Sequence, residues 1–382
     1  MKRACSSTAG LHFRLYKKSV DARKREDIRL VYSVLATLPE DKAFPADKLT
    51  AAGFKPHYPV ALTLTHGATP LSGRPLVVGM GPAGLFCTLV LAMAGLRPIL
   101  LERGRPVEQR AVDVEHFWST GQLSPLSNVQ FGEGGAGTFS DGKLNTGLNN
   151  PRISWILEQM VAAGAAEEIL FDAKPHVGTD VLLTVVQNIR QRIISLGGEV
   201  RFNSCVANIR YENGRLTGLE LADGGVVECD TAVFAIGHSA RDTFEMLHAL
   251  EVPMSQKAFS IGARIEHKQE MINRSQYGAA AKHPALGAAD YKLSVHLPNG
   301  RAAYTFCMCP GGQVVAAASE EGGVVVNGMS YFARDGENAN SALLVSVGPG
   351  DYGADDPLAG VRFQRKWEEA AFIAGGRSYR AP

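Results

Sequence analysis

Three glycines, a proline and one acid have the types and spacing needed to hold a nucleotide. Gly79, Gly81 and Gly84 form the pattern Gly-x-Gly-x-x-Gly, and Glu102 follows further along the chain. The first glycine would permit a tight turn, the second would leave no Cβ between the backbone and a pyrophosphate, and the third would let a helix lie close on its strand. Pro82 suits a first helical turn, where no backbone N–H is needed. These residues predict a dinucleotide site, with pyrophosphate at a helix amino end and ribose hydroxyls on the acid.

Two short apolar strands and a helix must position this turn. Residues 76–78 (LVV) and 99–101 (ILL) read as buried parallel strands on either side of a helix, so residues 75–104 predict a βαβ unit. An apolar stretch of this length could also be a membrane span, which needs about 20 residues. The glycines and proline at its start, and the internal pair Arg97 and Pro98, argue against that alternative.

Length and composition limit the class of protein. The chain has 382 residues, 45% hydrophobic residues and a formal net charge of +1. That length predicts two or three domains, and the balanced charge gives no case for nucleic acid or an anionic membrane. The amino terminus has no apolar signal core, and the six cysteines show no metal-ligand pattern. We therefore expect a cytoplasmic protein with a small-molecule substrate, no nucleic-acid or membrane partner and no metal site, and the oligomeric state stays open.

The order of patterns along the chain predicts four segments. Residues 1–73 read as a small N-terminal α/β domain that ends in a linker over residues 56–73. Residues 74–250 form the nucleotide-binding domain, and residues 251–350 consist of extended runs with tight turns, which predict an antiparallel β-rich domain. Residues 351–382 contain an amphipathic helix candidate that begins the return to the nucleotide domain.

A glycine-rich loop over residues 131–147 is a second candidate for ligand binding. It contains Gly134 and Gly135 together with two aromatic residues, a composition that favours an ordered loop over a disordered one. Backbone amides without side chains can line a phosphate or a flat ring. Asp141 and Lys143 would then be the polar groups beside the ligand.

The elements after this loop have an order that separates protein classes. A helix is expected over residues 180–196 with Thr179 as its cap, followed by strands over residues 199–211 and 216–221 and a returning strand that ends at Gly237. Nicotinamide-only dehydrogenases do not usually have this βαβ, helix and meander order. Flavin-binding proteins of the glutathione reductase type do.

Five sequence blocks together resemble one family. They are YKKSVDARK; VVGMGPAGLF with LLERG; NVQFGEGGAGTFSDGKL; FAIGHSARDTFEML; and FCMCPGG with NGMSYFARDGENANSALLV. They resemble the uncharacterised FAD-dependent dehydrogenases, also called NAD(FAD)-utilising dehydrogenases, from about residue 14 to 380. The resemblance implies an α/β glutathione-reductase-type FAD-binding βαβ domain with an inserted antiparallel β-rich second domain and a small N-terminal α/β domain. It also implies noncovalent FAD, with NAD(P)H as a candidate electron donor, and names no substrate.

The expected cofactor contacts come from the turn, the acid and its neighbour, one helix arginine, the glycine-rich loop and two later strands. They are Gly79, Met80, Gly81, Pro82, Ala83, Gly84, Glu102, Arg103, Arg110, Gly134, Gly135, Val206 and Gly237. Relatives continue past the position of Pro382 with a segment that carries a Gly-acid-Gly motif and covers the flavin ring. We expect this chain to lack that segment.

Few residues qualify for catalysis, because a flavin would carry out the electron transfer and the protein need add only a proton donor or base and a substrate clamp. The weak candidates are Asp141, Lys143, His238 and Arg241, each of which can equally be structural. Cys307 and Cys309 invite a redox interpretation. Residues two apart in a strand lie about 6.5 to 7 Å apart, however, which is long for a disulfide, so we expect small buried side chains there.

Three functions from different classes follow. The first is a FAD-dependent oxidoreductase, a dehydrogenase of unknown substrate that would be yellow and bleach on reduction. The second is a flavin-dependent monooxygenase, which would show substrate-stimulated oxygen uptake. The third is a non-catalytic nucleotide-binding fragment or scaffold, which would bind ADP without turning over a reductant.

Overall fold

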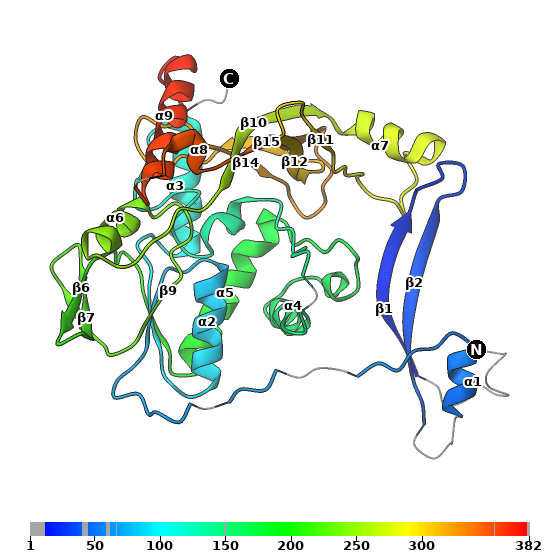
Figure 1. Cartoon of the computed structure of the whole chain (residues 1–382). Coiled ribbons are helices and arrows are strands. Elements are labelled where there is room, and N and C mark those ends of the chain that lie inside the picture. Colours follow the sequence, from blue (N-terminus) through cyan, green and yellow to red (C-terminus); the bar gives the residue numbers. More distant parts are fainter. Residues whose placement is uncertain are drawn as a thin grey trace.

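The fold combines a parallel sheet covered by helices with an antiparallel β-rich domain (Figure 1). The computed structural model describes residues 12–39, 45–58, 62–65, 67–148, 150–354 and 356–379. The start of the predicted N-terminal domain, parts of the predicted linker and the last residues of the chain lie outside these ranges.

The predicted βαβ unit is present and lies at the centre of a parallel sheet. Its strands are β3 (Leu76–Val78), β4 (Ile99–Leu101), β5 (Glu199–Arg201) and β9 (Ala232–Phe234), in the order β5-β4-β3-β9. Each neighbouring pair is parallel. Helix α2 (Pro82–Met93) makes the crossover from β3 to β4. The central strands β3 and β4 are fully buried, which explains why their sequences are continuous apolar runs.

Helices cover the sheet and position the loops at its carboxyl edge. They are α3 (Val107–Thr120), α4 (Arg152–Ala162), the 3-10 helix η2 (Glu167–Leu170), α5 (Thr179–Ser195) and α6 (Arg241–Ala249). Leu89, Leu100 and Ile189 belong to the apolar core between α2, α5 and the sheet. The prediction that Thr179 caps α5 is wrong, because Thr179 is the first helical residue and donates its hydroxyl to the Ser140 carbonyl at 2.7 Å. That bond ties α5 to the glycine-rich loop.

A three-stranded meander joins the parallel sheet to its last strand. It consists of β6 (Val206–Glu212), β7 (Arg215–Leu221) and β8 (Val226–Glu228), paired antiparallel. The single strand predicted over residues 199–211 is in fact two strands, because Asn203 has a left-handed φ of 53° that ends β5. This break lets β5 stay in the parallel sheet while β6 leaves it, and it places Val206 at the start of β6.

The second domain is antiparallel, as the turn-rich sequence predicts. Its larger sheet has the order β10-β15-β12-β11, and its smaller sheet pairs β13 with β14. The strands are β10 (Phe259–Lys268), β11 (Ser294–His296), β12 (Ala302–Cys309), β13 (Gln313–Ala316), β14 (Val326–Met329) and β15 (Asn338–Val347). The sequence analysis did not anticipate the helix α7 (Gln269–Tyr277) or the short 3-10 helix η3 (Gly278–Ala280) that follow β10.

Over its described residues, the amino-terminal segment consists of a long hairpin and a short helix. Strands β1 (His12–Asp21) and β2 (Arg29–Thr37) pair antiparallel, and the short helix α1 (Ala46–Ala51) buries none of its residues. Figure 1 shows the hairpin standing beside the body of the molecule. Lys18 anchors it there, donating its backbone N–H to Phe171 and accepting one from Ala173. We therefore describe the predicted small α/β domain as a hairpin and a helix held by the body.

The chain returns to the nucleotide domain through α8 (Pro349–Tyr352) and α9 (Ala359–Ala374), and α9 confirms the amphipathic helix expected near the end. Within the described residues, no helix combines the length and the apolarity that a bilayer span requires.

Candidate functional site

The turn between β3 and α2 has the steric properties that its glycines predict. Gly79 has φ of 95°, and a Cβ there would lie 2.7 Å from the Ala235 carbonyl oxygen. A Cβ on Gly84 would lie 1.8 Å from the Gly79 carbonyl oxygen, so only glycine lets α2 lie this close to its strand. A Cβ on Gly81 meets no protein atom within 4 Å. The structure confirms the steric roles of Gly79 and Gly84, and it leaves open space in front of Gly81.

The amino end of α2 faces that open space without a side-chain cap. Gly81 is the N-cap residue in an extended conformation, and no side chain accepts a hydrogen bond from the first turn. The carbonyl of Gly81 starts the helical pattern by accepting the Leu85 N–H at 2.9 Å. Unpartnered N–H groups and the positive helix end make such a terminus an anion site.

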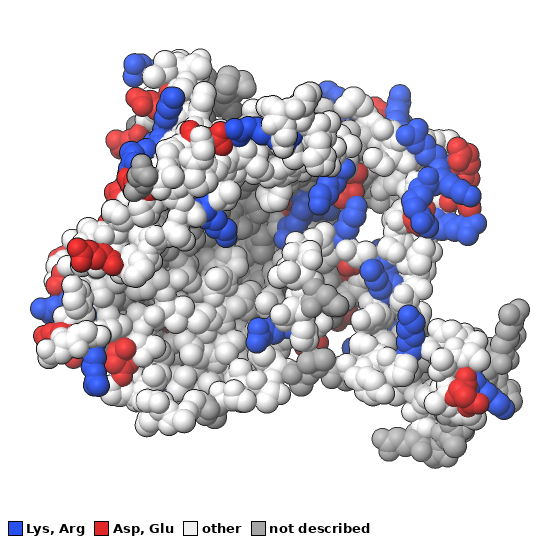
Figure 2. All heavy atoms as spheres, viewed as in Figure 1, with Lys and Arg blue, Asp and Glu red and all other residues white. Residues whose placement is uncertain are grey.

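A cleft of about 480 Å³ opens above this terminus. In the view of Figure 2 the surface is hollowed between the parallel-sheet domain and the antiparallel domain. The predicted residues that line the cleft are Gly79, Met80, Gly81, Pro82, Ala83, Glu102, Arg103, Gly135, Val206, Gly237 and His238. The described lining residues include one acid, Glu102, and one arginine, Arg103. Most of the others are apolar. A concave, mostly apolar site of this size with a few polar groups suits a small molecule or cofactor.

Glu102 braces the turn as well as facing the cleft. Its Oε2 accepts the Met80 N–H at 2.7 Å, and its Oε1 accepts the N–H groups of Gly104 at 2.9 Å and Gly132 at 3.0 Å. The side chain is buried. A carboxylate has roughly four acceptor positions, so about one remains for a ribose hydroxyl. The predicted contact with the ribose can therefore use only about one acceptor position of Glu102, because backbone N–H groups occupy the other positions.

Arg103 and Phe131 form the cleft wall beside Glu102. The Arg103 guanidinium lies 4.4 Å from the centre of the Phe131 ring and pairs with Asp242 at 3.0 Å. Arg103 also donates to the Thr243 hydroxyl at 3.0 Å. Sequence reasoning did not select Phe131 as a site residue, although an aromatic side chain at the start of a glycine-rich loop was a usable signal.

Arg110 does not line the cleft, so the prediction that it contacts the cofactor is wrong. It is completely buried, and its guanidinium donates to five backbone carbonyls of the loop that follows α3. The acceptors are Asn128, Val129, Gly132, Glu133 and Gly135. Burial lowers the pKa of Arg110 to about 10, and Glu102 and Glu133 oppose that shift, so the side chain stays charged at neutral pH. Its function is to shape the loop that forms the cleft wall.

Gly134 also lies behind the cleft wall. Its N–H donates to the Met80 carbonyl at 2.8 Å, which joins the loop to the turn, and the residue lines a separate apolar cavity of about 370 Å³. Gly135 does face the cleft, and a Cβ there would lie 2.9 Å from the Gly81 Cα. The loop continues through the short 3-10 helix η1 (Gly135–Phe139). The prediction of an ordered loop is confirmed, with one glycine at the cleft and the other behind it.

Glu133 is a structural acid that sequence reasoning missed. It is fully buried, accepts the Val107 N–H at 2.8 Å and pairs with Arg190 at 2.8 Å. Burial raises its pKa to about 7, against the hydrogen bond from Val107 and the charge of Arg190. An acid inside a glycine-rich stretch was the only available signal. Glu133 links the loop to the start of α3 and to the carboxyl half of α5.

Asp141 and Lys143 lie away from the cleft and next to the second domain. Asp141 is buried and pairs with Lys143 at 2.8 Å and with Arg334. Lys143 lines the apolar cavity behind the loop. The two candidates therefore form an ion cluster between domains, and the structure does not bring them to the nucleotide turn.

Of the remaining catalytic candidates, only His238 lines the cleft. Arg241 is buried and joins α6 to the end of the chain, with Glu320 at 2.7 Å, Glu368 at 2.6 Å and Gln364 at 3.0 Å. Two of these partners belong to α9, so Arg241 acts as a clamp and not as a cleft residue.

We expect Arg241→Ala to lower stability without changing nucleotide affinity. The substitution leaves the mostly buried Glu368 without its ion-pair partner, whereas Glu320 keeps Arg365, so the expected loss is about 3 kcal/mol. Chemical denaturation of the substituted and unsubstituted chains measures that loss. Arg362→Ala, an exposed arginine on α9 that pairs with Asp356, is the matched control and should have little effect. An unchanged unfolding midpoint for Arg241→Ala would contradict the clamp.

Comparison with known proteins defines the class. The family described as "FAD-dependent protein, C-terminal domain-like" matches residues 258–382, and "Flavin containing amine oxidoreductase" matches residues 155–283. The chain is 50% identical over 372 residues to an uncharacterised protein of Clostridium beijerinckii, a match covering 96% of this chain and 69% of that protein. The chain belongs to the same family as the clostridial protein. The two family models match it to FAD-dependent and flavin-containing oxidoreductases and imply an FAD cofactor.

Solved structures give weaker likenesses. Tetracycline destructase Tet(51) aligns at 15% identity with a TM-score of 0.35, covering 77% of this chain and 62% of that chain. The glycerol-3-phosphate dehydrogenase from Bacillus halodurans complexed with FAD aligns at 12% identity with a TM-score of 0.35, covering 80% and 53%. These scores are too low to establish a common fold. The chain spans less than two thirds of the length of either protein.

Proposed function

We propose that this protein binds FAD noncovalently in the cleft above α2 and acts as a dehydrogenase that passes hydride or electrons through the flavin. The observation that carries the proposal is the uncapped amino end of α2, which meets open space at Gly81 and has Glu102 beside it. A dinucleotide fits this cradle, because its pyrophosphate needs N–H donors and close backbone approach, and both are present.

The residues that would hold the cofactor follow from the cleft wall. The amides at the amino end of α2 would donate to the pyrophosphate, and the remaining acceptor position of Glu102 would take a ribose hydroxyl. Val206, buried at the start of β6, would lie against the adenine. Arg103 on Phe131 would close the same end of the cleft.

The bound flavin would supply hydride or electron transfer. The loop over residues 131–137 would cover one side of the cleft and exclude water, held in place by Arg110 behind it. His238 is the candidate proton donor or acceptor, because its imidazole is exposed on the cleft lining. NAD(P)H is the proposed electron donor and would bind without a βαβ dinucleotide unit of its own.

Titration of the cofactor-free protein with FAD, ADP and FMN tests this function. FAD should bind most tightly, ADP should bind more weakly, and FMN should bind weakest because it lacks the adenosine and the pyrophosphate that the cleft recognises. Anaerobic addition of NADH or NADPH should then bleach the bound flavin. Protein that gains no flavin absorbance at saturating FAD would contradict the proposal.

Oxygen uptake measured in air, together with the ADP titration, separates the alternatives. A flavin-dependent monooxygenase would consume oxygen faster when its organic substrate is added, whereas a dehydrogenase would pass electrons to another acceptor without oxygen. Binding of ADP with no binding of FAD would support a nucleotide-binding scaffold and would contradict the dehydrogenase.

A further inference from the structure

Strand β12 carries two cysteines on either side of a backbone irregularity. Its register with β15 shifts between Phe306 and Cys309, and Cys307 has a left-handed φ of 47°. A non-glycine residue in that conformation costs about 1 to 3 kcal/mol and is found most often at functional sites. The expectation that these residues follow the flat spacing of a regular strand is therefore wrong, because a bulge turns the chain between them.

The bulge places the Cys309 thiol against the backbone of Cys307. The Cys309 Sγ lies 3.3 Å from the Cys307 carbonyl oxygen, to which the thiol donates. Cys309 is fully buried, whereas Cys307 is only partly buried. Gly328 on β14 makes the room, since a Cβ there would lie 2.6 Å from the Cys309 Sγ.

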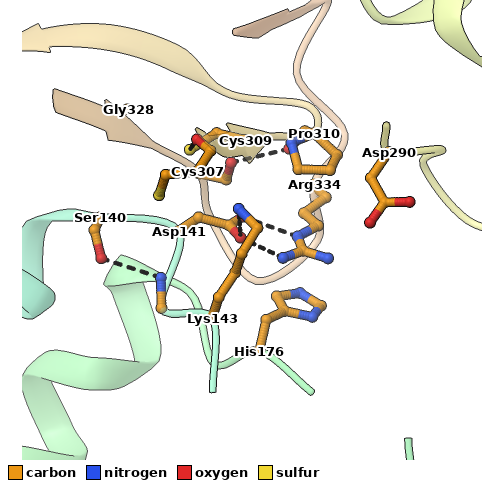
Figure 3. Close-up of polar contacts among 12 residues, drawn as sticks. Ser140, Asp141, Lys143, His176, Asp290, Cys307, Cys309, Pro310, Gly328 and Arg334 are labelled. Atoms are coloured by element: carbon orange, nitrogen blue, oxygen red, sulfur yellow. Dashed lines mark hydrogen bonds and ion pairs between the residues drawn. The ribbon is translucent and has the colours of Figure 1, made fainter. Parts of the chain in front are cut away.

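Two cations, Arg264 and Lys143, act on Cys307. Arg264 donates to the Cys307 carbonyl at 3.3 Å, and Lys143 approaches from the glycine-rich loop, paired with the buried Asp141. Figure 3 shows Lys143 and Arg334 meeting at Asp141, with both cysteines on the strand beside them.

The contacts of the two sulfurs give them different acidities. The hydrogen bond from Cys309 lowers the pKa of Cys307, burial opposes this shift, and Lys143 and Arg264 reinforce it. The same hydrogen bond and burial raise the pKa of Cys309. An accessible thiolate beside a protonated, buried partner is the arrangement of an attacking and a resolving thiol.

We propose that Cys307 and Cys309 form a thiol–disulfide exchange centre whose substrates are disulfides, with Cys307 attacking and Cys309 resolving. The Cys307 thiolate forms a bond to one substrate sulfur as the substrate S–S bond breaks and one thiolate leaves. Cys309 then loses its proton to solvent, and its sulfur attacks Cys307, forming the Cys307–Cys309 disulfide and releasing the second thiolate. The dithiol gives up two electrons, and the substrate disulfide is reduced to two thiols. This chemistry uses no flavin.

Competitive alkylation tests the attacking thiol. The reduced protein is treated with limiting iodoacetamide at about pH 6, where an ordinary thiol with a pKa near 8.5 is almost fully protonated. Cys307 should be labelled at least about tenfold faster than Cys87 and Cys205, which are also partly buried and whose pKa values burial raises. Labelling of Cys307 at the rate of these two controls would overturn the proposal.

Oxidation by glutathione disulfide tests the pair. The tryptic peptide of residues 302–334 contains both cysteines and no others, so mass spectrometry should show it two hydrogens lighter without reductant. The Cys309→Ser variant should instead retain glutathione on Cys307. The Cys307→Ser variant should retain no glutathione on Cys309. Circular dichroism checks that both variants fold. No mass change in the unsubstituted peptide, or no glutathione on a folded Cys309→Ser variant, would contradict the exchange centre.

Discussion

Gly81→Ala is expected to fold like the unsubstituted protein and to bind FAD at least about a hundredfold more weakly, a loss of roughly 2.7 kcal/mol. A Cβ at this position meets no protein atom within 4 Å, so the fold has no reason to change. The same Cβ enters the cleft at the uncapped end of α2, where the pyrophosphate is proposed to lie. Quenching of FAD fluorescence measures the affinity, and thermal unfolding measures the stability.

Two other glycines provide matched controls for this substitution. Gly73→Ala also meets no atom within 4 Å but lies outside the cleft, so affinity and stability should both be retained. Gly84→Ala places a Cβ 1.8 Å from a backbone oxygen and should destabilise the fold. Equal FAD affinity in Gly81→Ala and Gly73→Ala would place the pyrophosphate elsewhere.

Arg110→Ala should destabilise the protein by about 4 kcal/mol or more. The substitution leaves several buried carbonyls without their donor, each at a cost of about 1 to 3 kcal/mol, and some of them will be rehydrated as the loop relaxes. Guanidinium chloride denaturation measures the effect. Arg110→Lys should recover only part of the stability, because an ammonium cannot reproduce the planar set of donors.

Arg105→Ala controls for loss of a positive charge near α3. Arg105 is half exposed and pairs with Asp113 of α3, which also accepts the Ser127 hydroxyl, so removal of Arg105 should change stability little. A loss for Arg110→Ala as small as that for Arg105→Ala would show that the buried hydrogen bonds do not hold the loop.

The nucleotide turn could be predicted from the sequence because its constraints are local. Gly79 is required by its own left-handed φ and Gly84 by the Gly79 carbonyl, and residues 76–78 and 99–101 show their burial as continuous apolar runs. Glu102 was placed correctly beside the turn for the same reason. Its use by three backbone amides was not predictable, because one of the donors, Gly132, lies on a distant loop.

The errors involve contacts between segments far apart in the chain. We predicted that Arg110 contacts the cofactor and that Arg241 is a weak catalytic candidate, and only the folded arrangement shows that they donate to a loop and to α9. We predicted a regular strand at Cys307, because a cysteine in the sequence does not indicate a left-handed backbone conformation. The space for its partner depends on Gly328, on a strand that the sequence does not show to be a neighbour.

A crystal structure of the chain with bound FAD tests the central claim most directly. We predict that pyrophosphate oxygens accept hydrogen bonds from the amides at the amino end of α2 and that the adenosine ribose lies against Glu102. FAD bound elsewhere, or a vacant cleft at a saturating concentration of FAD, would contradict the assignment of this site.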